Sequence, residues 1–246
     1  MAETRWQQLA ETLRRDLAAM PPGTAVLGDN ELAERYGVAR MTAAQAIRAL
    51  ADEGLVLRVK GHGTTVRDLR PILLHDSRYV ASAGGAMAGG PWSVAVTEAG
   101  MRPGVKVTSV DRLVVDQAPA DVRQYLDSGE VIRRQRIMSA DDQPGALTTS
   151  WIPAGIADGT PLAEPGFIAR GTYQAMRDAG FVPKHGLESV RSRFATEFES
   201  KALRLSARAS VLDIVQVTYG KDDRVLQVLQ TIADSTRVAV QYVISF

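Results

Sequence analysis

The sequence predicts an α+β protein with two domains: a small N-terminal domain of helices ending in a β-hairpin, and a larger domain built on an antiparallel sheet. Apolar residues recur at helical spacing in three early segments, and two short β-prone runs joined by a glycine-bearing turn follow them. Farther along, long strand-like runs succeed one another without regular strand–helix alternation. We place the domains at residues 1–68 and 92–246, joined by a linker at 69–91.

Composition narrows the classes of protein that the chain can represent. Of its 246 residues, 45% are hydrophobic and 23% are charged, which is typical of a folded globular protein. The absence of cysteine excludes disulfides and thiolate metal sites, and the three histidines are scattered, so we expect no metal and no cofactor. No apolar run approaches the roughly 18 to 20 residues of a membrane-spanning helix, and the N-terminus is charged. We therefore expect a cytoplasmic protein without membrane contact.

The N-terminal domain is expected to begin with two helices. Apolar residues recur every three or four positions over residues 6–20, and Pro21-Pro22-Gly23 ends this helix. Asp29 is the expected N-cap of a second helix over residues 30–36. Gly37 supplies the left-handed residue that stops it.

The second helix and a third, over residues 41–53 and closed by Gly54, have the spacing of a helix-turn-helix. Ala33 is small where two helices must approach, Gly37 lies at the turn and Val38 follows it. Such a unit inserts the start of its second helix into the major groove of DNA, where Arg reads guanine and Gln reads adenine. The same spacing also occurs in ordinary helix packing, and helix arginines often form only a solvated face. The residues expected to contact DNA are Asn30, Arg40, Met41, Thr42, Gln45 and Arg48.

A hairpin follows the third helix. Two β-prone runs, residues 55–59 and 64–66, are joined by a turn with two glycines. The glycines allow the backbone to approach the minor groove, and the basic side chains between them face phosphates. Helix, turn, helix and hairpin in this order predict a winged DNA-binding domain. The turn residues expected at the DNA are Lys60, Gly61, His62 and Gly63.

The charge of this domain is nearly balanced. Residues 1–70 contain ten Lys and Arg against nine Asp and Glu, and the whole chain has a net charge of +1. Bulk electrostatic attraction to DNA is therefore weak. Specific contacts from Arg40, Thr42, Gln45 and the hairpin must provide the affinity, which makes binding as a dimer a requirement.

The second domain is expected to be mainly β. Residues 83–90 are a run of small residues, typical of a flexible connection. The strand-like runs are residues 105–115, 131–137, 146–152, 187–194, 211–219, 225–233 and 238–244. The helix-like runs are residues 120–126, 171–179 and 197–205.

The N-terminal stretch resembles the winged helix of GntR-type regulators. The resemblance rests on segments 31–38 (ELAERYGV), 40–42 (RMT), 45–50 (QAIRAL), 53–55 (EGL) and 61–66 (GHGTTV). The chain departs from the family pattern at two places. Residues 27–30 replace a usual Pro-Ser-Glu-Arg, and Ala43-Ala44 replaces a common Val-Arg. The DNA sequence that relatives recognise is therefore not transferable.

The remaining chain resembles the effector-sensing UTRA domain of the HutC subfamily, which is similar in fold to chorismate lyase. The resemblance rests on segments 98–103 (EAGMRP), 134–136 (RQR), 142–144 (DQP), 150–153 (SWIP) and 233–242 (ADSTRVAVQY). It implies a chorismate-lyase-like antiparallel-sheet sensor domain. It also implies effector-binding positions at Arg134, Arg136, Thr148, Thr172, Tyr173, Glu188, Gln227 and Gln230.

The two arginines of segment 134–136 suggest what kind of effector is bound. Alternate strand residues share a face, so Arg134 and Arg136 would present two guanidinium groups, which suit a phosphate or carboxylate. The alternative is an exposed, ion-paired strand face. Thr148 stands where sugar-phosphate sensors of this type tend to have Glu, which argues against a phosphorylated amino sugar.

These features lead to an expectation for function: a homodimeric repressor that binds an inverted repeat in double-stranded DNA and is released by a small, anionic effector. One alternative is a repressor that answers to no effector and whose second domain only dimerises. A remoter alternative is an enzyme with a lyase-like domain. The sequence has no Ser-His-Asp set, no Gly-rich phosphate loop and no histidine cluster, so we expect no enzymatic activity.

Overall fold

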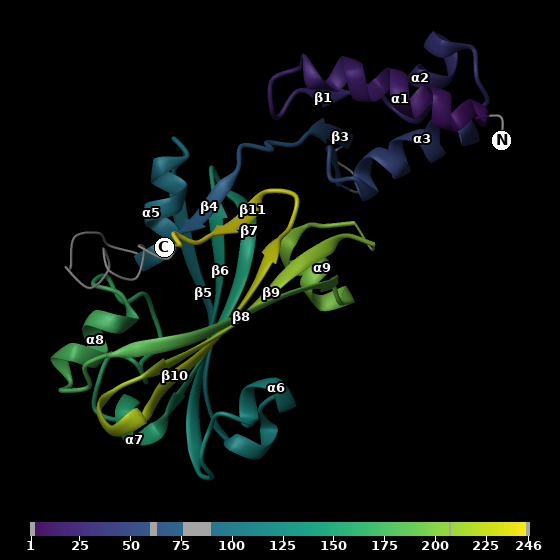
Figure 1. Ribbon diagram of the computed structural model, residues 1–246. Helices are drawn as coiled ribbons and strands as arrows, with labels where there is room; N and C mark the ends of the chain where they lie inside the picture. The colour runs from purple at the N-terminus through teal and green to yellow at the C-terminus, as the bar shows by residue number, and fades with distance from the viewer. Residues whose placement is uncertain (1–2, 60–62, 76–89, 207, 245–246) are drawn as a thin grey trace. The chain divides into compact units, whose positions relative to one another are not determined.

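The computed structural model describes residues 3–59, 63–75, 90–206 and 208–244 (Figure 1). The chain divides into two compact units. The first comprises residues 1–70 with 194–209, and the second residues 71–193 with 210–246. Among the described residues, no helix is long and apolar enough to cross a membrane.

Within residues 3–66, the described part of the first unit forms three helices around one core and a small three-stranded sheet. Its helices are α1 (Arg5–Ala18), α2 (Asp29–Tyr36) and α3 (Arg40–Asp52). Its strands are β1 (Ala25–Val26), β2 (Val56–Val59) and β3 (Gly63–Val66), in the order β1-β3-β2. The predicted helix-turn-helix and hairpin are confirmed. The buried core residues are Leu9, Ala10, Leu13, Leu17, Leu32, Ala43, Ala46, Ile47, Leu50, Val56 and Val66.

One local prediction for this unit is wrong. Asp29 is not the N-cap of α2, because the helix begins at Asp29 itself and Gly28 is the extended cap residue. The Gly28 N–H donates to the Glu31 carboxylate at 2.7 Å. The Asp29 carboxylate instead accepts from Arg58 on β2 at 2.7 Å. This ion pair joins the start of α2 to the hairpin.

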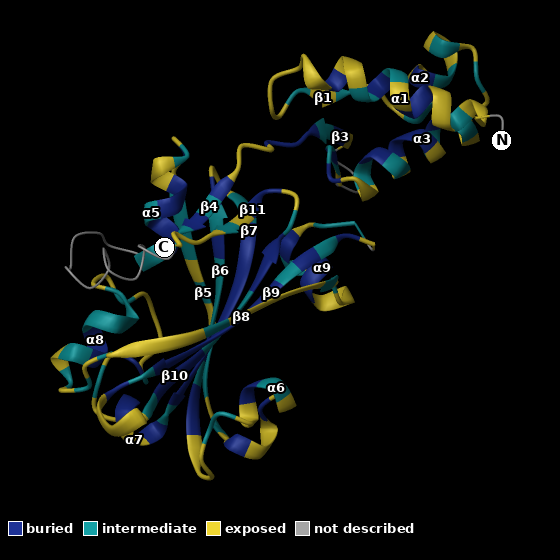
Figure 2. Cartoon of the chain, in the orientation of Figure 1, coloured by how far each residue is buried: buried dark blue, intermediate teal, exposed yellow. Residues whose placement is uncertain are grey.

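The second unit is built on one antiparallel sheet of six strands, in the order β5-β6-β7-β10-β9-β8. These strands are β5 (Pro103–Val114), β6 (Glu130–Ala140), β7 (Gln143–Pro153), β8 (His185–Phe194), β9 (Ser210–Tyr219) and β10 (Val225–Asp234). Two short strands, β4 (Ile72–His75) and β11 (Val238–Gln241), pair in parallel beside it. The central strands are mostly buried and edge strand β8 is mostly exposed (Figure 2).

Short helices cover the sheet of the second unit. They are α5 (Gly90–Glu98), α6 (Ala120–Arg123), α7 (Ala154–Ala157) and α8 (Thr172–Asp178), with 3₁₀ turns η1 (Val115–Gln117) and η2 (Lys221–Asp223). Helix α9 (Glu197–Leu203), which lies between β8 and β9 in the chain, belongs to the first unit and is capped by Thr196, whose hydroxyl accepts from the Glu199 N–H at 3.3 Å.

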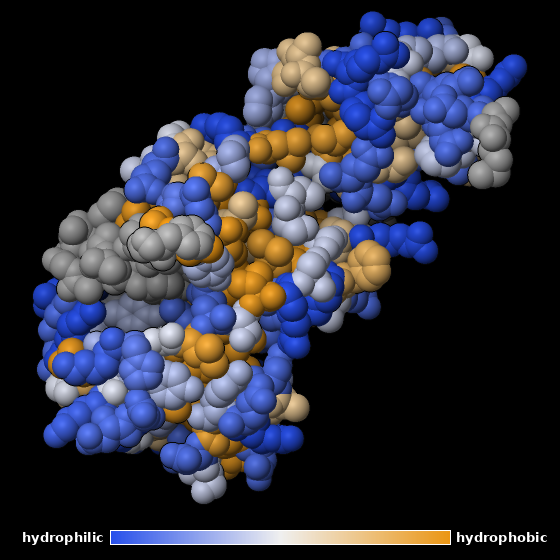
Figure 3. All heavy atoms as spheres, in the orientation of Figure 1, coloured by the Kyte–Doolittle hydropathy of each residue, from blue (hydrophilic) through white to orange (hydrophobic). Residues whose placement is uncertain are grey.

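Two hydrophobic clusters lie at opposite ends of one face of the sheet. At one end Trp92 of α5, with β4 and β11, packs on Met138 and Ile214. At the other end Met176 of α8, with α7, packs on Ile132 of β6. On the space-filling surface, hydrophobic side chains gather along the visible face of this unit (Figure 3). The stretch of sheet between the two clusters is where the candidate ligand cavity lies.

The linker prediction differs from the structure in part. Within the predicted linker at 69–91, residues 72–75 form β4 and Ile72 is fully buried, because β11 provides a hydrogen-bonding partner from the far end of the chain. Helix α5, which begins at Gly90, was not expected either. Its residues are apolar on most sides, so no helical stripe marks it in the sequence. Residues 76–89, which include most of the small-residue run, lie outside the described residues.

Candidate DNA interface and ligand cavity

The helix-turn-helix is held by a tight turn at Gly37. Gly37 adopts φ 62° and ψ 38°, a left-handed conformation that favours glycine. The next residue, Val38, donates its N–H to the Ala33 carbonyl at 3.0 Å, which closes the end of α2. Helix α3 begins at Arg40 only three residues after the turn. The spacing of Ala33, Gly37 and Val38 in the sequence therefore corresponds to the observed turn.

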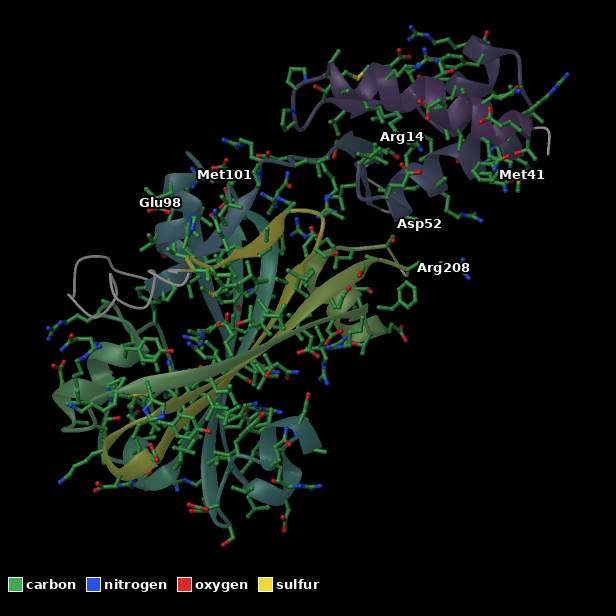
Figure 4. All side chains as sticks on the ribbon, in the orientation of Figure 1. Arg14, Met41, Asp52, Glu98, Met101 and Arg208 are labelled. Carbon is green, nitrogen blue, oxygen red and sulfur yellow. The ribbon has the colours of Figure 1, made fainter. Side chains whose placement is uncertain are left out.

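Helix α3 has one buried face and one exposed face. Ala43, Ala46, Ile47 and Leu50 are buried against the core. The side chain of Met41, near the start of the helix, is 73% exposed (Figure 4). Thr42 is half-buried. The other exposed residues of the predicted DNA-contact set on α2 and α3 are Asn30, Arg40, Gln45 and Arg48.

The starts of α2 and α3 come together in space. Asn30 and Arg40 line one shallow depression with Gly28, Asp29 and Glu31. Asn30, an uncharged amide, is therefore adjacent to Arg40. This part of the surface presents one cation beside an amide and two carboxylate side chains.

The hairpin beside the helices is described only in part. Gly63 begins β3 with φ 84°, which requires glycine. Lys60, Gly61 and His62, which are predicted to contact DNA, lie outside the described residues. Strand β2, which precedes them, is joined to α2 by the Arg58–Asp29 ion pair.

The second unit contains a cavity of about 120 Å³ between the two hydrophobic clusters. Its floor is the sheet, and its walls come from α5, β4 and the segment leading into α8. Six predicted effector-binding residues line it: Arg136, Thr148, Thr172, Tyr173, Glu188 and Gln227. The structure thus brings together residues that are up to 91 positions apart, from Arg136 to Gln227.

Arg136 is the central cation of the cavity. Its guanidinium donates to the Ser150 hydroxyl at 2.7 Å and to the Thr172 hydroxyl at 3.3 Å. No carboxylate forms an ion pair with it among the described residues. Burial, together with the nearby charge of Arg134 and against a smaller opposing effect of Tyr173, lowers the pKa of Arg136 from 12.5 to about 10. Arg136 is therefore a charged group at neutral pH without a counter-ion from the described chain.

Three polar atoms of the cavity have no hydrogen-bond partner among the described residues. They are Nε of Arg136, the hydroxyl oxygen of Thr148 and Oε1 of Gln227. Thr148 is 7% exposed and Gln227 is 2% exposed, so bulk water does not readily satisfy them. Buried polar groups are normally hydrogen-bonded, and unpaired ones are costly. Their convergence on one cavity is typical of a site that a ligand completes.

The remaining predicted residues form hydrogen bonds at the cavity. The Tyr173 hydroxyl donates to Gln216 Oε1 at 2.9 Å, and lies 3.3 Å from the Thr218 hydroxyl. The Glu188 carboxylate on edge strand β8 accepts from the Tyr242 hydroxyl at 2.8 Å. These bonds hold both side chains in defined positions in the cavity wall.

Two predicted effector residues do not line the cavity. Arg134 shares the face of β6 with Arg136 but is 1% exposed, and it donates to the carbonyls of Pro161, Leu162, Glu164 and Gly166 at 2.6–3.3 Å. It therefore fixes the loop that leads to α8. Gln230, which the sequence predicted to bind the effector, does not line the cavity. It lies on the other face of β10, where it donates to Asp213 at 3.0 Å. Gln227, Leu229 and Thr231 point into the cavity, and Gln230 is out of phase with them.

Sequence reasoning missed several cavity residues. Trp92 comes from α5, which was not recognised as a helix. Gln216 lies on β9, and the period-two alternation along that strand, which places it on the same face as Ile214, would have found it. Ser150 does not line the cavity, yet its hydroxyl links Arg136 to Gln227 Nε2, which donates to it at 3.4 Å. No signal in the sequence identifies that link.

An exposed helix-turn-helix with a hairpin, and a sheet domain with a polar cavity, define the protein as a winged-helix transcriptional regulator with a sensor domain. Comparison with known families agrees. Residues 6–66 match the gntR family of bacterial regulatory proteins, and residues 98–239 match the UTRA domain. The chain belongs to the GntR family, in the HutC subfamily, whose members are transcriptional regulators and not enzymes.

Individual relatives cover most of the chain. The HTH-type transcriptional regulator GgaR of Escherichia coli (strain K12) is 26% identical over 226 residues, which cover 89% of this chain and 83% of GgaR. The HTH-type transcriptional repressor NagR of Bacillus subtilis (strain 168) is 26% identical over 220 residues, covering 87% of this chain and 84% of NagR. The crystal structure of PhnF from Mycobacterium smegmatis has a TM-score of 0.60 at 22% identity, covering 96% of this chain and 99% of PhnF. That likeness shows the fold.

Proposed function

We propose that the protein is a homodimeric repressor that a small anionic molecule releases from its operator. The observation that carries this proposal is the cavity around Arg136, in which the guanidinium has no counter-ion and three buried polar atoms, Nε of Arg136, the Thr148 hydroxyl oxygen and Oε1 of Gln227, have no partner among the described residues. A domain that served only to dimerise would have no use for such groups, because each unpaired buried polar atom destabilises the fold. A ligand that paired with them would stabilise the state that it binds.

The DNA-binding half supports a dimer. Its ten basic and nine acidic side chains over residues 1–70 provide little general attraction to phosphates. Two copies that bind together add their contacts, and the symmetry of a dimer matches an inverted repeat with half-sites about one helical turn, or about 10 base pairs, apart. Such a protein acts on chromosomal DNA and therefore works in the cytoplasm.

Release requires that the ligand bind more tightly to a state that cannot hold both half-sites. In the free repressor the two winged helices fit the operator together. With ligand in the cavity, the sensor domains favour an arrangement in which they do not. Affinity for DNA and affinity for the ligand then oppose each other by the same factor.

Operator selection with the full chain tests the DNA half of this proposal. We expect random duplexes to converge on an inverted repeat, and Arg40→Ala to abolish the enrichment. Enrichment of a single half-site, or a monomer on DNA by light scattering, would contradict the dimer.

A thermal-shift screen of anionic metabolites tests the ligand half. A ligand at a hundred times its Kd stabilises the protein by about 2.7 kcal/mol. A broad screen without any shift, together with intact operator binding, would favour a repressor whose second domain only dimerises.

A further inference from the structure

The cavity floor changes character along the strands. Cross-strand neighbours place Val107, Arg136, Thr148, Thr231 and Ile214 in one row across five strands, and all five line the cavity. Two residues farther along β6, the floor becomes apolar. In the opposite direction along the same strands it becomes polar. Arg136 therefore lies at the boundary between two different surfaces.

The apolar end is closed by an aromatic ring. Val105 and Met138 are direct neighbours across β5 and β6, and both line the cavity with Trp92. The ring of Trp92 packs against Gly145, where an added Cβ would lie 2.6 Å from it. Its indole N–H donates to the Ser139 carbonyl at 3.0 Å, so the ring presents carbon atoms to the cavity. This end suits the hydrocarbon part of a ligand.

The polar end is where the unpaired groups lie. The Arg136 guanidinium and the Gln227 amide both donate to the Ser150 hydroxyl, at 2.7 and 3.4 Å, so the two side chains meet at one point. Gln227 Oε1 is an acceptor without a donor among the described residues, and it requires an O–H or N–H group from the ligand. Arg136 requires an anionic oxygen. The ligand is thus expected to carry an acid group with a hydroxyl nearby.

The charge of the lining limits the acid to one negative charge. Arg170 also lines the cavity, but it is paired with Asp178 at 3.2 Å. Arg136 is then the one cation without a carboxylate partner among the described lining residues, so it balances one negative charge of an acid group. A carboxylate matches this charge, whereas the second charge of a phosphate dianion would have no partner there.

The volume of the cavity limits the size of the ligand. The cavity of about 120 Å³ is slightly smaller than the roughly 150 Å³ cavity that accepts a benzene ring. A molecule of about six carbons therefore fills it. We infer that the ligand is a monocarboxylic acid of about this size, with an apolar tail and a hydroxyl group near the carboxylate, an inference that rests on the proposed ligand-controlled function.

Calorimetric titration of the full chain tests this inference. The compounds titrated share a six-carbon chain and differ in their head group. Hexanoate is expected to bind at least tenfold more tightly than hexanamide or hexyl phosphate, because only hexanoate matches the single charge. It is expected to bind at least tenfold more tightly than acetate, because four additional methylene groups enter the apolar end. 3-Hydroxyhexanoate, which supplies a donor for Gln227, is expected to bind several-fold more tightly still.

Variants identify the site of binding. Arg136→Gln is expected to weaken hexanoate at least tenfold, and Arg136→Lys, which keeps the charge, less. The matched control is Arg133→Gln, because Arg133 precedes Arg134 on the same strand but faces away from the cavity and pairs with Asp111 at 2.7 Å. It should leave binding unchanged. Unfolding curves are measured for all three variants, to check that the fold is intact.

Several outcomes would overturn the inference: no binding of any hexyl compound, tighter binding of hexyl phosphate or inorganic phosphate than of hexanoate, or equal losses in Arg136→Gln and Arg133→Gln. Failure of the proposed function looks different. If a carboxylate binds through Arg136 but leaves the affinity for the operator unchanged, the inference about the ligand holds and the proposed release from DNA is contradicted. If a sugar phosphate binds through Arg136 and releases the protein from the operator, the proposed release holds and the inference about the ligand is contradicted.

Discussion

Replacing each of the two inward-facing arginines of β6 by methionine should separate the stability of the sensor domain from ligand binding. Arg134 makes four bonds to backbone carbonyls. At about 1 kcal/mol each, the net value of a typical hydrogen bond, these bonds contribute about 4 kcal/mol. This low value applies because three of the four carbonyl-bearing residues are exposed, and water can replace the lost donor. Arg134→Met is therefore expected to unfold about 8–16 °C earlier in the transition of the sensor domain.

Arg136→Met should behave in the opposite way. The pKa of Arg136 is lowered from 12.5 to about 10, chiefly by burial, so holding its charge in the fold costs about 3 kcal/mol at neutral pH. For a base with a lowered pKa, this cost is full below pH 10 and vanishes as the pH rises toward 12.5. The variant loses two hydrogen bonds, worth about 2 kcal/mol, and removes the cost. Its stability should lie within about 1 kcal/mol of the wild type or above it.

Scanning calorimetry and calorimetric titration of the same samples provide the two measurements. We expect Arg134→Met to be unstable yet able to bind ligand at low temperature, and Arg136→Met to be stable and unable to bind. Suppose instead that Arg136→Met lowered the free energy of unfolding by about 3 kcal/mol or more, and that Arg134→Met left it unchanged. The roles assigned to the two guanidinium groups would then be reversed, and the cavity would not be a ligand site.

Four further changes follow from the structure. Arg40→Ala should abolish specific DNA binding and leave ligand binding unchanged, because Arg40 is exposed at the start of α3; electrophoretic mobility shift measures the first and calorimetry the second. Asn30→Arg should tighten DNA binding and steepen its salt dependence by about 0.9 in the log–log slope, because one more phosphate is neutralised. Gly37→Ala should destabilise the first unit by about 1 kcal/mol in urea unfolding, because φ is 62° and no neighbouring atom lies within 4 Å of an added Cβ. Asp213→Asn should cost about 3 kcal/mol at pH 7, because Asp213 is buried and accepts from Arg191 and Arg193.

Asp213→Asn should also change how the stability of the protein depends on pH. Burial raises the pKa of Asp213, but hydrogen bonds from Arg193, Gln230 and Arg191 outweigh it and lower the pKa below its usual value. An acid with a lowered pKa stabilises the fold above its unfolded pKa of about 3.9, and this stability is lost as the pH falls through the folded pKa. Unfolding of Asp213→Asn between pH 5 and pH 2 should accordingly depend less on pH than that of the wild type. Equal slopes would contradict this assignment.

Each of the DNA-binding and backbone predictions has its own control. Arg40→Ala should retain the wild-type unfolding midpoint, and loss of ligand binding in that variant would show that the two units do not act separately. An unchanged salt slope for Asn30→Arg would mean that position 30 does not face DNA. A Gly37→Ala variant as stable as the wild type would show that the turn relaxes out of the left-handed region.

Local signals in the sequence predicted the first unit well. A glycine at the turn, small and apolar residues at helical spacing and a glycine-bearing hairpin each depend on neighbours within a few positions, so α2, α3 and the hairpin were all foreseen. The N-cap of α2 was misplaced by one residue, because an Asp that could cap the helix is used instead in an ion pair with Arg58. That pairing spans 29 positions and leaves no local mark.

The second unit was predictable in its strands and less so in its site. Strand alternation placed Arg136 on the correct face, and the resemblance to sensor domains gave Thr148, Thr172 and Gln227. Arg134 does not line the cavity, because its guanidinium donates to backbone carbonyls of the loop at residues 161–166, which packs over β6. Likewise β4 is a strand only because β11, more than 160 positions later, pairs with it. Such long-range contacts are decided by the fold and not by the local sequence.

If a ligand in the Arg136 cavity controls DNA binding, fluorescence anisotropy with the selected operator detects this control. The full chain is titrated onto labelled operator with and without a saturating ligand, for the wild type and for Arg136→Met. We predict that ligand raises the Kd for DNA of the wild type at least fivefold, the lower end of typical allosteric coupling, and leaves the Kd of Arg136→Met unchanged. A wild-type Kd for DNA that does not change, while calorimetry shows that ligand occupies the cavity, would contradict control of DNA binding by the ligand.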